Sequence, residues 1–423
     1  MIKTLFDHYK FGSSIFIYLV IVMFFFIFNP QGLSTDYGSG GGRFADRVDS
    51  FSEYIIRNTI TRNIVTKGNT SFLPIMTKGY TNSDYTYYPD KPLKYYTNIC
   101  FQTIPATVFA EIFRINTEKK LYTYFSVFRF MNALLLSILL IGIFTCFCHT
   151  QKLKTASLIP LVVGSSSGFI YFCQNMYFLS FLIILPAFFI AVQLTTQGKY
   201  SKLLVFIFGL LYFFRGYEFA TVFALFSAFI AALFVPGKIS KKIKSASLAF
   251  GLICLSFVLT TIVHGLIVLA DSHWQLSLSE SYRLAFGSLQ YRTASINGVP
   301  PPFSNQFYTT MNTRLNCSAF SVMAKGFKLS ELSVILLMLA GTIIRTGKMS
   351  HNELLIYLYG FFGYASWYIF AYQHIMWHDM YDWHIFALTT GLSFSLLLLF
   401  YSSIAFNYFL TLYLKFQNKP IQM

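Results

Sequence analysis

Charged residues are scarce in this chain of 423 residues. Asp, Glu, Lys and Arg together make up 11% of it, against about 25% in an average soluble globular domain. Hydrophobic residues account for 55% of the chain and aromatic residues for 19%. Several apolar runs reach ~18 residues, the length that a helix needs to cross the hydrocarbon core of a bilayer. The composition therefore excludes a soluble globular protein and predicts an all-α polytopic membrane protein.

Acidic residues are the scarcer of the two charged kinds, with 16 against 32 Lys and Arg, which gives a net charge of +16. In a soluble protein this excess would indicate a nucleic-acid partner. Here the basic residues fall in short polar breaks between apolar runs, and the positive-inside rule assigns such breaks to the cytoplasm. We therefore expect the lipid bilayer as a partner and no nucleic acid.

That assignment predicts about ten transmembrane helices in one membrane domain, residues 1–423, with both termini in the cytoplasm. The first run is too long and too aromatic for a cleaved signal peptide, so we expect it to be retained as a helix. The predicted helices lie near residues 12–30, 121–147, 155–173, 177–194, 203–215, 217–235, 245–269, 329–345, 352–372 and 385–412.

Cysteines are also few, with six in the chain. Four of them fall within or directly beside the predicted helices, where cysteine packs as a small hydrophobic residue. Cys100 and Cys317 fall in the two long polar segments. The sequence leaves open whether these two form a disulfide, which an oxidising compartment would permit.

Most of the polar residues lie in segments that the topology assigns to the outer face. Residues 31–120 form a large first external loop in which we expect short helices, and residues 270–328 form a second external loop. The patch 373–384 and the turn "FRGYE" at 214–218 fall on the same face. The cytoplasmic connections are short and basic, so the chemistry is expected outside.

An outer face that combines carboxylates with isolated cations suits group transfer from a lipid-linked donor. The leaving group of such a donor is a phosphate anion, which cations must hold, and the acceptor hydroxyl needs a carboxylate to take its proton. Arg215 suits the first role, because a guanidinium binds phosphate through two parallel hydrogen bonds. An alternative is that Arg215 snorkels to the interface and pairs with Glu218.

Four short motifs appear in the order typical of one enzyme superfamily. They are Asp49-Ser-Phe-Ser-Glu53-Tyr54 followed by Gly68, Asp90-Lys91-Pro92-Leu93-Lys94-Tyr95-Tyr96, Phe128-Arg129-Phe130-Met131-Asn132-Ala133-Leu134, and Phe214-Arg215-Gly216-Tyr217. With these motifs the first 235 or so residues resemble the GT-C membrane glycosyltransferases, especially relatives of aminoarabinose transferase and protein mannosyltransferases. The chain departs from that pattern at Gln174 and Asn175, where many relatives carry a second acid.

The resemblance implies a GT-C-like fold and a set of site residues. Asp49 is the first candidate for the catalytic base, and Asp36 and Asp46 remain alternatives; the chosen Asp could instead cap the following helix. Lys91, Arg129 and Arg215 would bind the donor phosphate. For Lys91 a solvated loop position, and for Arg129 an interfacial anchor, stay open.

Further contacts are expected from aromatic and basic residues on the same face. His378 of the patch 373–384 is a candidate for the donor phosphate, and Tyr54, Tyr95, Arg292 and His384 are candidates for sugar or acceptor contacts. The histidine spacing in the patch is not diagnostic of a metal site, so we expect no metal and no cofactor. Interfacial anchoring by the patch is the alternative.

These observations predict a glycosyltransferase of the bacterial inner membrane with a periplasmic active site. It would move a sugar from a polyprenyl-phosphate donor, such as an undecaprenyl phosphate, to a polysaccharide or lipid-linked acceptor, and it would invert the anomeric centre. The enzymes that decorate the O-antigen of lipopolysaccharide have a similar composition. An O-antigen polymerase or ligase that uses lipid-diphosphate glycans is the alternative, and a flippase or transporter is the alternative of another class. The sequence leaves open the sugar, the acceptor and the oligomeric state.

Overall fold

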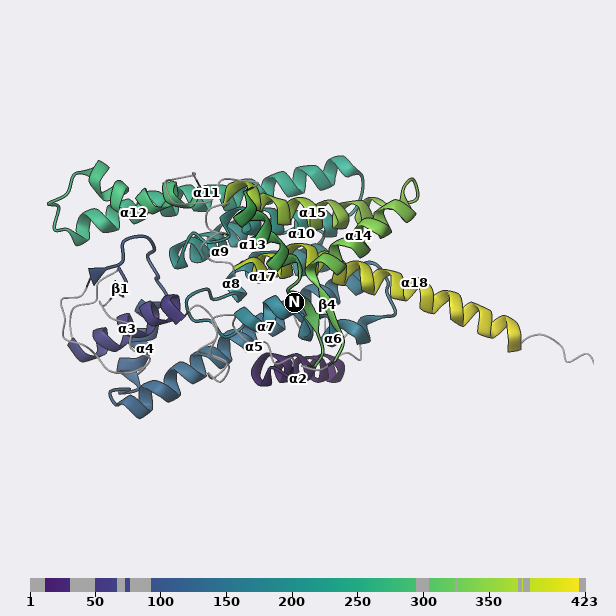
Figure 1. Cartoon of the computed structure of the whole chain (residues 1–423), viewed down its shortest axis with the longest axis horizontal. Helices are drawn as coiled ribbons and strands as arrows, with labels where there is room; N and C mark the ends of the chain where they lie inside the picture. The colour runs from purple at the N-terminus through teal and green to yellow at the C-terminus, as the bar shows by residue number, and fades with distance from the viewer. Residues whose placement is uncertain are drawn as a thin grey trace, which may run out of the picture.

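The computed structural model describes residues 12–30, 50–66, 73–76, 93–293, 304–323, 326–371, 375 and 381–417. Within these ranges the chain is mostly helical, and its strands form two small antiparallel sheets (Figure 1). The helices are α2 (Gly12–Phe28), α3 (Ser50–Thr66), α4 (Thr103–Ile112), α5 (Glu118–Thr150), η2 (Ala156–Leu158), α6 (Ile159–Gly164), α7 (Ser167–Phe172), α8 (Phe181–Gln197), α9 (Lys202–Arg215), α10 (Ala220–Phe234), α11 (Ile239–Asp271), α12 (Leu278–Thr293), α13 (Asn305–Leu315), α14 (Glu331–Arg345), α15 (His351–Phe370), α17 (Tyr381–Phe386), the π-helical turn η3 (Ala387–Gly391) and α18 (Leu392–Gln417). The strands are β1 (Ile75–Met76) paired with β2 (Leu93–Lys94), and β3 (Ser318–Ser321) paired with β4 (Lys328–Ser330).

The prediction of an all-α polytopic membrane protein is confirmed. Three stretches, Lys119–Thr150, Ile239–Asp271 and Asp382–Leu414, are long and apolar enough to cross a membrane. Shorter apolar helices accompany them, among them α2, α8 and α10. Each of the ten ranges predicted to be helical contains helix, although the boundaries shift by several residues.

The outer surface of the bundle is itself apolar, as expected for a protein that faces lipid. Ile343 and Ile344 at the end of α14 expose 74% and 75% of their surface, and Phe362 of α15 exposes 67%. The interior is aromatic as well: the rings of Phe229 and Tyr359 stack with their centroids 4.1 Å apart. A water-soluble protein would not leave so many large side chains uncovered.

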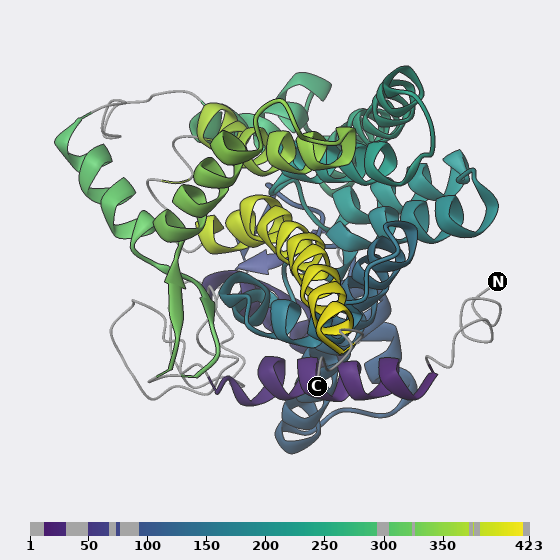
Figure 2. The same cartoon turned by 90° about the vertical axis from the view of Figure 1, so that its right-hand side faces the viewer.

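One predicted helix is broken. The sequence predicts one helix near 155–173, with tilted or half-spanning helices between 155 and 235 as the alternative; in the structure η2, α6 and α7 divide the range, and Ser166 between α6 and α7 is extended with ψ at 110°. The backbone groups freed there are satisfied by β3, because Ser321 N–H donates to the Ser165 carbonyl at 2.9 Å and Ser166 forms a bridge with Phe320. Irregular backbone at membrane depth is tolerated where protein covers it in this way. Figure 2 shows the two strands as arrows beside the bundle.

The described elements of the segment 31–120, which is predicted to be external, lie at one end of the molecule. Figure 1 shows α3, α4 and β1 at the left end together with α12, while α18 projects from the other end. The ammonium of Lys94 on β2 reaches the Asp271 carboxylate at the end of α11, 2.5 Å away. All six cysteines are free, so Cys100 and Cys317 do not form a disulfide in this structure.

Candidate functional site

The turn between α9 and α10 places two opposite charges in the protein interior. Arg215, the last residue of α9, is completely buried, and Glu218 is 4% exposed. A guanidinium nitrogen of Arg215 lies 3.3 Å from Oε2 of Glu218. The turn closes through Phe219, which adopts a left-handed φ of 63°, and through Gly216, where a Cβ would lie 2.5 Å from Glu218 Oε2. The structure shows the pairing of Arg215 with Glu218, but Arg215 does not snorkel to the interface, because its side chain is completely buried.

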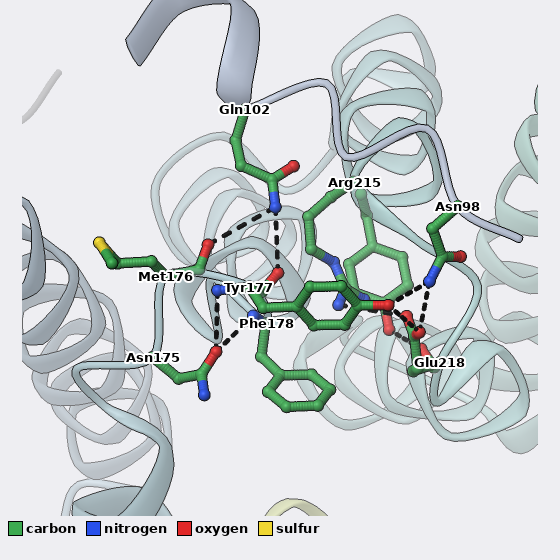
Figure 3. A network of polar contacts seen from close by, with 9 residues as sticks. Asn98, Gln102, Asn175, Met176, Tyr177, Phe178, Arg215 and Glu218 are labelled. Atoms are coloured by element: carbon green, nitrogen blue, oxygen red, sulfur yellow. Dashed lines mark hydrogen bonds and ion pairs between the residues drawn. The ribbon is translucent and has the colours of Figure 1, made fainter. Parts of the chain in front are cut away.

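The Glu218 carboxylate also joins this turn to two distant segments (Figure 3). Its Oε1 accepts hydrogen bonds from the hydroxyl of Tyr177 and from the side-chain amide of Asn98, both at 2.7 Å. The Asn98 amide also contacts the Tyr177 hydroxyl, and the Tyr212 hydroxyl donates to the Glu218 carbonyl. The carboxylate therefore fixes the segment around Asn98 against the segment that precedes α8 and the turn that follows α9.

Aromatic rings rather than hydrogen-bond acceptors surround the Arg215 guanidinium. Its central carbon lies 4.7 Å from the ring centroid of Tyr212 and 5.8 Å from that of Phe178. Apart from the ion pair with Glu218, none of its three nitrogens has a hydrogen-bond partner among the described residues. Buried donors of this kind are costly to leave unsatisfied, and a guanidinium with unused donors retains its capacity to bind an anion.

His384 of α17 packs against the turn between α9 and α10. It is completely buried, and its ring lies 4.6 Å from the ring of Phe172 and 5.2 Å from the ring of Phe219. Neither ring nitrogen has a hydrogen-bond partner within the described part of the chain. His384 thus packs against the same strained turn that holds Arg215.

A second buried ion pair connects the first external loop to the bundle. Glu53 in the first turn of α3 accepts hydrogen bonds from Nε and Nη2 of Arg129 on α5, at 3.2 and 2.5 Å. The other oxygen of Glu53 accepts from the backbone N–H of Met176 at 2.9 Å. One carboxylate thereby links the loop, α5 and the segment between α7 and α8.

The amides that replace the expected second acid have a structural role in that segment. Asn175 Oδ1 accepts from the backbone N–H groups of Tyr177 and Phe178, at 2.8 and 2.9 Å. Its carbonyl accepts from Asn132 of α5 at 3.2 Å, and Gln102 donates to the Tyr177 carbonyl at 3.2 Å. The segment is therefore held rigidly between the two ion pairs, and the contacts run without a gap from Arg129 to Arg215.

Two further acids are buried near the second external loop. Glu331, at the start of α14, and Asp382 of α17 are 0% and 1% exposed. The Tyr364 hydroxyl of α15 lies within hydrogen-bond distance of both, at 3.2 and 2.9 Å, and Tyr368 donates to Asp382 at 2.6 Å. Glu331 is not among the site residues expected from the sequence, although an acid inside a predicted span is a usable signal of a functional or buried polar site.

The structure brings together some of the candidate residues and not others. Arg215 and His384 lie at the turn between α9 and α10, and Arg129 is linked to the segment between α7 and α8 through Glu53. Tyr54 is half-buried on α3, and the backbone of Tyr95 donates to the Pro74 carbonyl at 2.8 Å. Arg292 belongs to α12. Asp36, Asp46, Asp49, Lys91 and His378 lie outside the described residues.

Comparisons with known proteins give a likeness in structure only. No protein-family model and no curated protein sequence matches the chain. Two solved structures resemble it: the archaeal oligosaccharyltransferase AglB from Archaeoglobus fulgidus in complex with an inhibitory peptide and a dolichol-phosphate, with a TM-score of 0.47, and the oligosaccharyltransferase of the same organism in its apo form, with a TM-score of 0.49. Each is 14% identical, over 98% and 97% of this chain. The chain spans 52% of the length of either structure.

Proposed function

We propose that this protein is a GT-C-type membrane glycosyltransferase that takes a sugar from a polyprenyl-phosphate donor. One observation carries the proposal: a buried polar network runs from Glu53 and Arg129 through Tyr177 to Glu218 and Arg215. Buried charges at a membrane-embedded position are costly and therefore mark functional sites. The network joins two of the four motifs on which the family resemblance depends to a third, which contains Arg215.

Arg215 is the group that we assign to the donor phosphate. Its guanidinium carries donors that Glu218 alone does not satisfy. In the buried state the aromatic rings of Tyr212 and Phe178 cover it, so donor binding requires the left-handed turn at Phe219 to open. A strained turn of this kind is typical of sites that change conformation. The phosphate would then take the place of the Glu218 carboxylate on the cation.

In the proposed reaction the acceptor oxygen attacks the anomeric carbon as the bond from that carbon to the phosphate oxygen breaks. The bonding electrons leave with the polyprenyl phosphate, whose negative charge Arg215 stabilises. Asp49 takes the proton of the acceptor hydroxyl, and attack from the face opposite the phosphate inverts the anomeric centre. Asp49 directly precedes Ser50, where α3 begins, and Glu53 in the first turn of α3 anchors that helix to Arg129.

The acceptor that we propose is a surface polysaccharide on the outer face of the bacterial inner membrane. Tyr54, Tyr95 and Arg292, which belong to the two external loops, are the candidates for contacting it. Aromatic rings and guanidinium groups suit carbohydrate surfaces, which present both apolar C–H faces and hydroxyl groups.

The decisive experiment measures transfer of a radiolabelled sugar from polyprenyl phosphate to polysaccharide in membranes. The Asp49→Asn variant should retain its membrane insertion and lose activity by about 10²–10⁴-fold, the range for removal of a general base. The control variant Asp271→Asn changes only the ion pair between Asp271 and Lys94. It should keep near-normal activity. Normal transfer by Asp49→Asn would remove Asp49 from the role of base.

The same assay distinguishes the proposed transferase from a polymerase or ligase and from a transporter. A polymerase or ligase would use a lipid-diphosphate glycan and leave the monophosphate donor unconsumed. A transporter would move labelled lipid across the membrane without forming a glycosidic bond.

A further inference from the structure

A large cavity lies between α2, α5, α8 and α10, away from the two buried ion pairs. Its volume is about 760 Å³, within the range of about 300–1,000 Å³ typical of small-molecule sites. The walls are mainly apolar and include Leu19 of α2, Ile138 and Ile141 of α5, Phe188 of α8 and Phe234 of α10. A cavity with such walls favours a hydrocarbon chain.

The position of the cavity along α5 indicates its depth in the bilayer. Arg129, which faces the first external loop, lies near the start of α5, whereas the cavity is lined from Ile138 to Thr150, where the helix ends. At 1.5 Å per residue this stretch covers about 18 Å. One leaflet occupies half of a ~30 Å hydrocarbon core, ~15 Å, so the lined stretch is about as long as one acyl chain. Because Arg129 marks the side of the predicted external loops, the cavity lies in the opposite leaflet.

Basic side chains stand where the cavity reaches the end of α5. His149 and Lys152 both line it and both are exposed, and a left-handed φ of 53° at Lys152 ends the helix there. Deeper inside, the Thr145 hydroxyl oxygen is buried without a hydrogen-bond partner in the described residues. The cavity thus combines an apolar body with a mouth that carries the Lys152 ammonium, which is the charge pattern that complements an anionic lipid.

We propose that this cavity binds one anionic glycerophospholipid of the cytoplasmic leaflet, with an acyl chain inside and the phosphate at Lys152 and His149. The position of the Lys152 ammonium selects this occupant over the sugar donor. A polyprenyl phosphate carries its charge at the outer face, and the end of its chain presents no anion to the mouth. The choice between these two occupants rests on the proposed function, which puts the donor phosphate at the outer face, whereas the occupancy of the cavity is measured without any sugar donor.

The first test compares lipid stabilisation of the purified protein in detergent. Addition of dioleoyl-phosphatidylglycerol should raise the thermal midpoint more than dioleoyl-phosphatidylcholine does. The double variant His149→Gln/Lys152→Gln should respond equally to both lipids. The control Lys244→Gln, an exposed lysine of α11 outside the cavity, should keep the wild-type preference. Equal responses of the wild type, or an unchanged preference in the double variant, would overturn the proposal.

A second test fills the cavity and does not depend on charge. Thr145→Trp should lower the amount of phospholipid that remains on the purified protein, measured by extraction and mass spectrometry. Thr123→Trp, at an exposed position of the same helix, should leave it unchanged. Equal retention by both variants would contradict binding in the cavity. Displacement of phosphatidylglycerol from the wild type, but not from Thr145→Trp, by an added polyprenyl phosphate would instead assign the cavity to the donor chain.

Discussion

Glu53 and Arg129 lie 76 positions apart in the chain, and their side chains form an ion pair with 2.5 Å between carboxylate and guanidinium. Both are almost fully buried, with side-chain exposures of 3% and 8%. The pair fixes α3 of the first external loop to α5 of the membrane bundle. Because the Glu53 carboxylate also binds the Met176 backbone, a change at this one residue affects three elements.

Loss of the Glu53 carboxylate is expected to be strongly destabilising. Glu53→Ala leaves the Arg129 guanidinium buried without its counter-charge, and removal of one partner of a buried pair costs about 3–5 kcal/mol. The measurement is thermal or denaturant unfolding in detergent. Lys94 and Asp271 provide the control, because Lys94 is 38% exposed in its ion pair. Lys94→Ala should cost at most about 1 kcal/mol, and equal losses in the two variants would contradict the structural role of Glu53.

At the Arg215–Glu218 pair, the effect of the charges on activity can be separated from their effect on folding. Arg215→Met alone leaves a buried carboxylate unpaired, so a loss of activity in that variant would be ambiguous. The double variant Arg215→Met/Glu218→Gln removes both charges and keeps an amide oxygen that can accept from Tyr177. We expect it to fold and to lose transfer activity by about 10²-fold or more, the size of a lost electrostatic contact in a transition state.

The measurement for the double variant is kcat/KM for the polyprenyl-phosphate donor, together with the thermal midpoint. The control is a second ion pair, between Arg345 at the C-terminal end of α14 and Glu353 of α15. The double variant Arg345→Met/Glu353→Gln should keep near-normal transfer. If the two double variants are equally active, Arg215 has no role at the donor phosphate.

Close backbone packing between α7 and α17 leads to a prediction about glycine. A Cβ at Gly168 would lie 2.0 Å from the backbone carbonyl oxygen of Trp383, and the backbone cannot yield as a flexible side chain can. Gly168→Ala should therefore lower the free energy of unfolding by about 1–3 kcal/mol, as overpacking does. At Gly251 of α11 a Cβ would have no neighbouring atom within 4 Å, so Gly251→Ala should be neutral or slightly stabilising. Unfolding of both variants in detergent measures the difference.

The sequence was sufficient to predict most of the helices, because a long apolar run in a membrane protein has few alternatives to helix. It failed at Ser166, where the chain is extended. The cause is a tertiary contact: β3 supplies backbone partners from a segment more than 150 positions away. Hydropathy carries no signal for such pairing.

The candidate site was predictable only in part, because its partners, like the break at Ser166, depend on tertiary contacts. Arg129 and Arg215 stand out because charge is rare in the chain, and both lie in the network. Their partners are harder to predict. Asn98 and Tyr177 are ordinary polar residues in the sequence, and only the fold brings them to the Glu218 carboxylate. Glu331 lies inside a predicted span, and its partner Tyr364 is 33 positions away, so spacing in the sequence could not identify it.

Cys100 and Cys317 should differ sharply in their reactivity toward a membrane-impermeant maleimide. Cys100 is completely buried beside the network, and burial, with a further contribution from the nearby Glu218 carboxylate, raises the pKa of its thiol well above the ordinary value. The thiolate is the reactive form, so a raised pKa keeps Cys100 protonated and unreactive even at about pH 9, where an ordinary thiol of pKa about 8.5 is mostly ionised. Cys317 is partly exposed and should be labelled, a signal that Cys317→Ser removes. Mass spectrometry of labelled peptides measures both sites, and Cys100 should react only after the protein is unfolded. Labelling of Cys100 in the folded protein would show that the polar network opens to solvent.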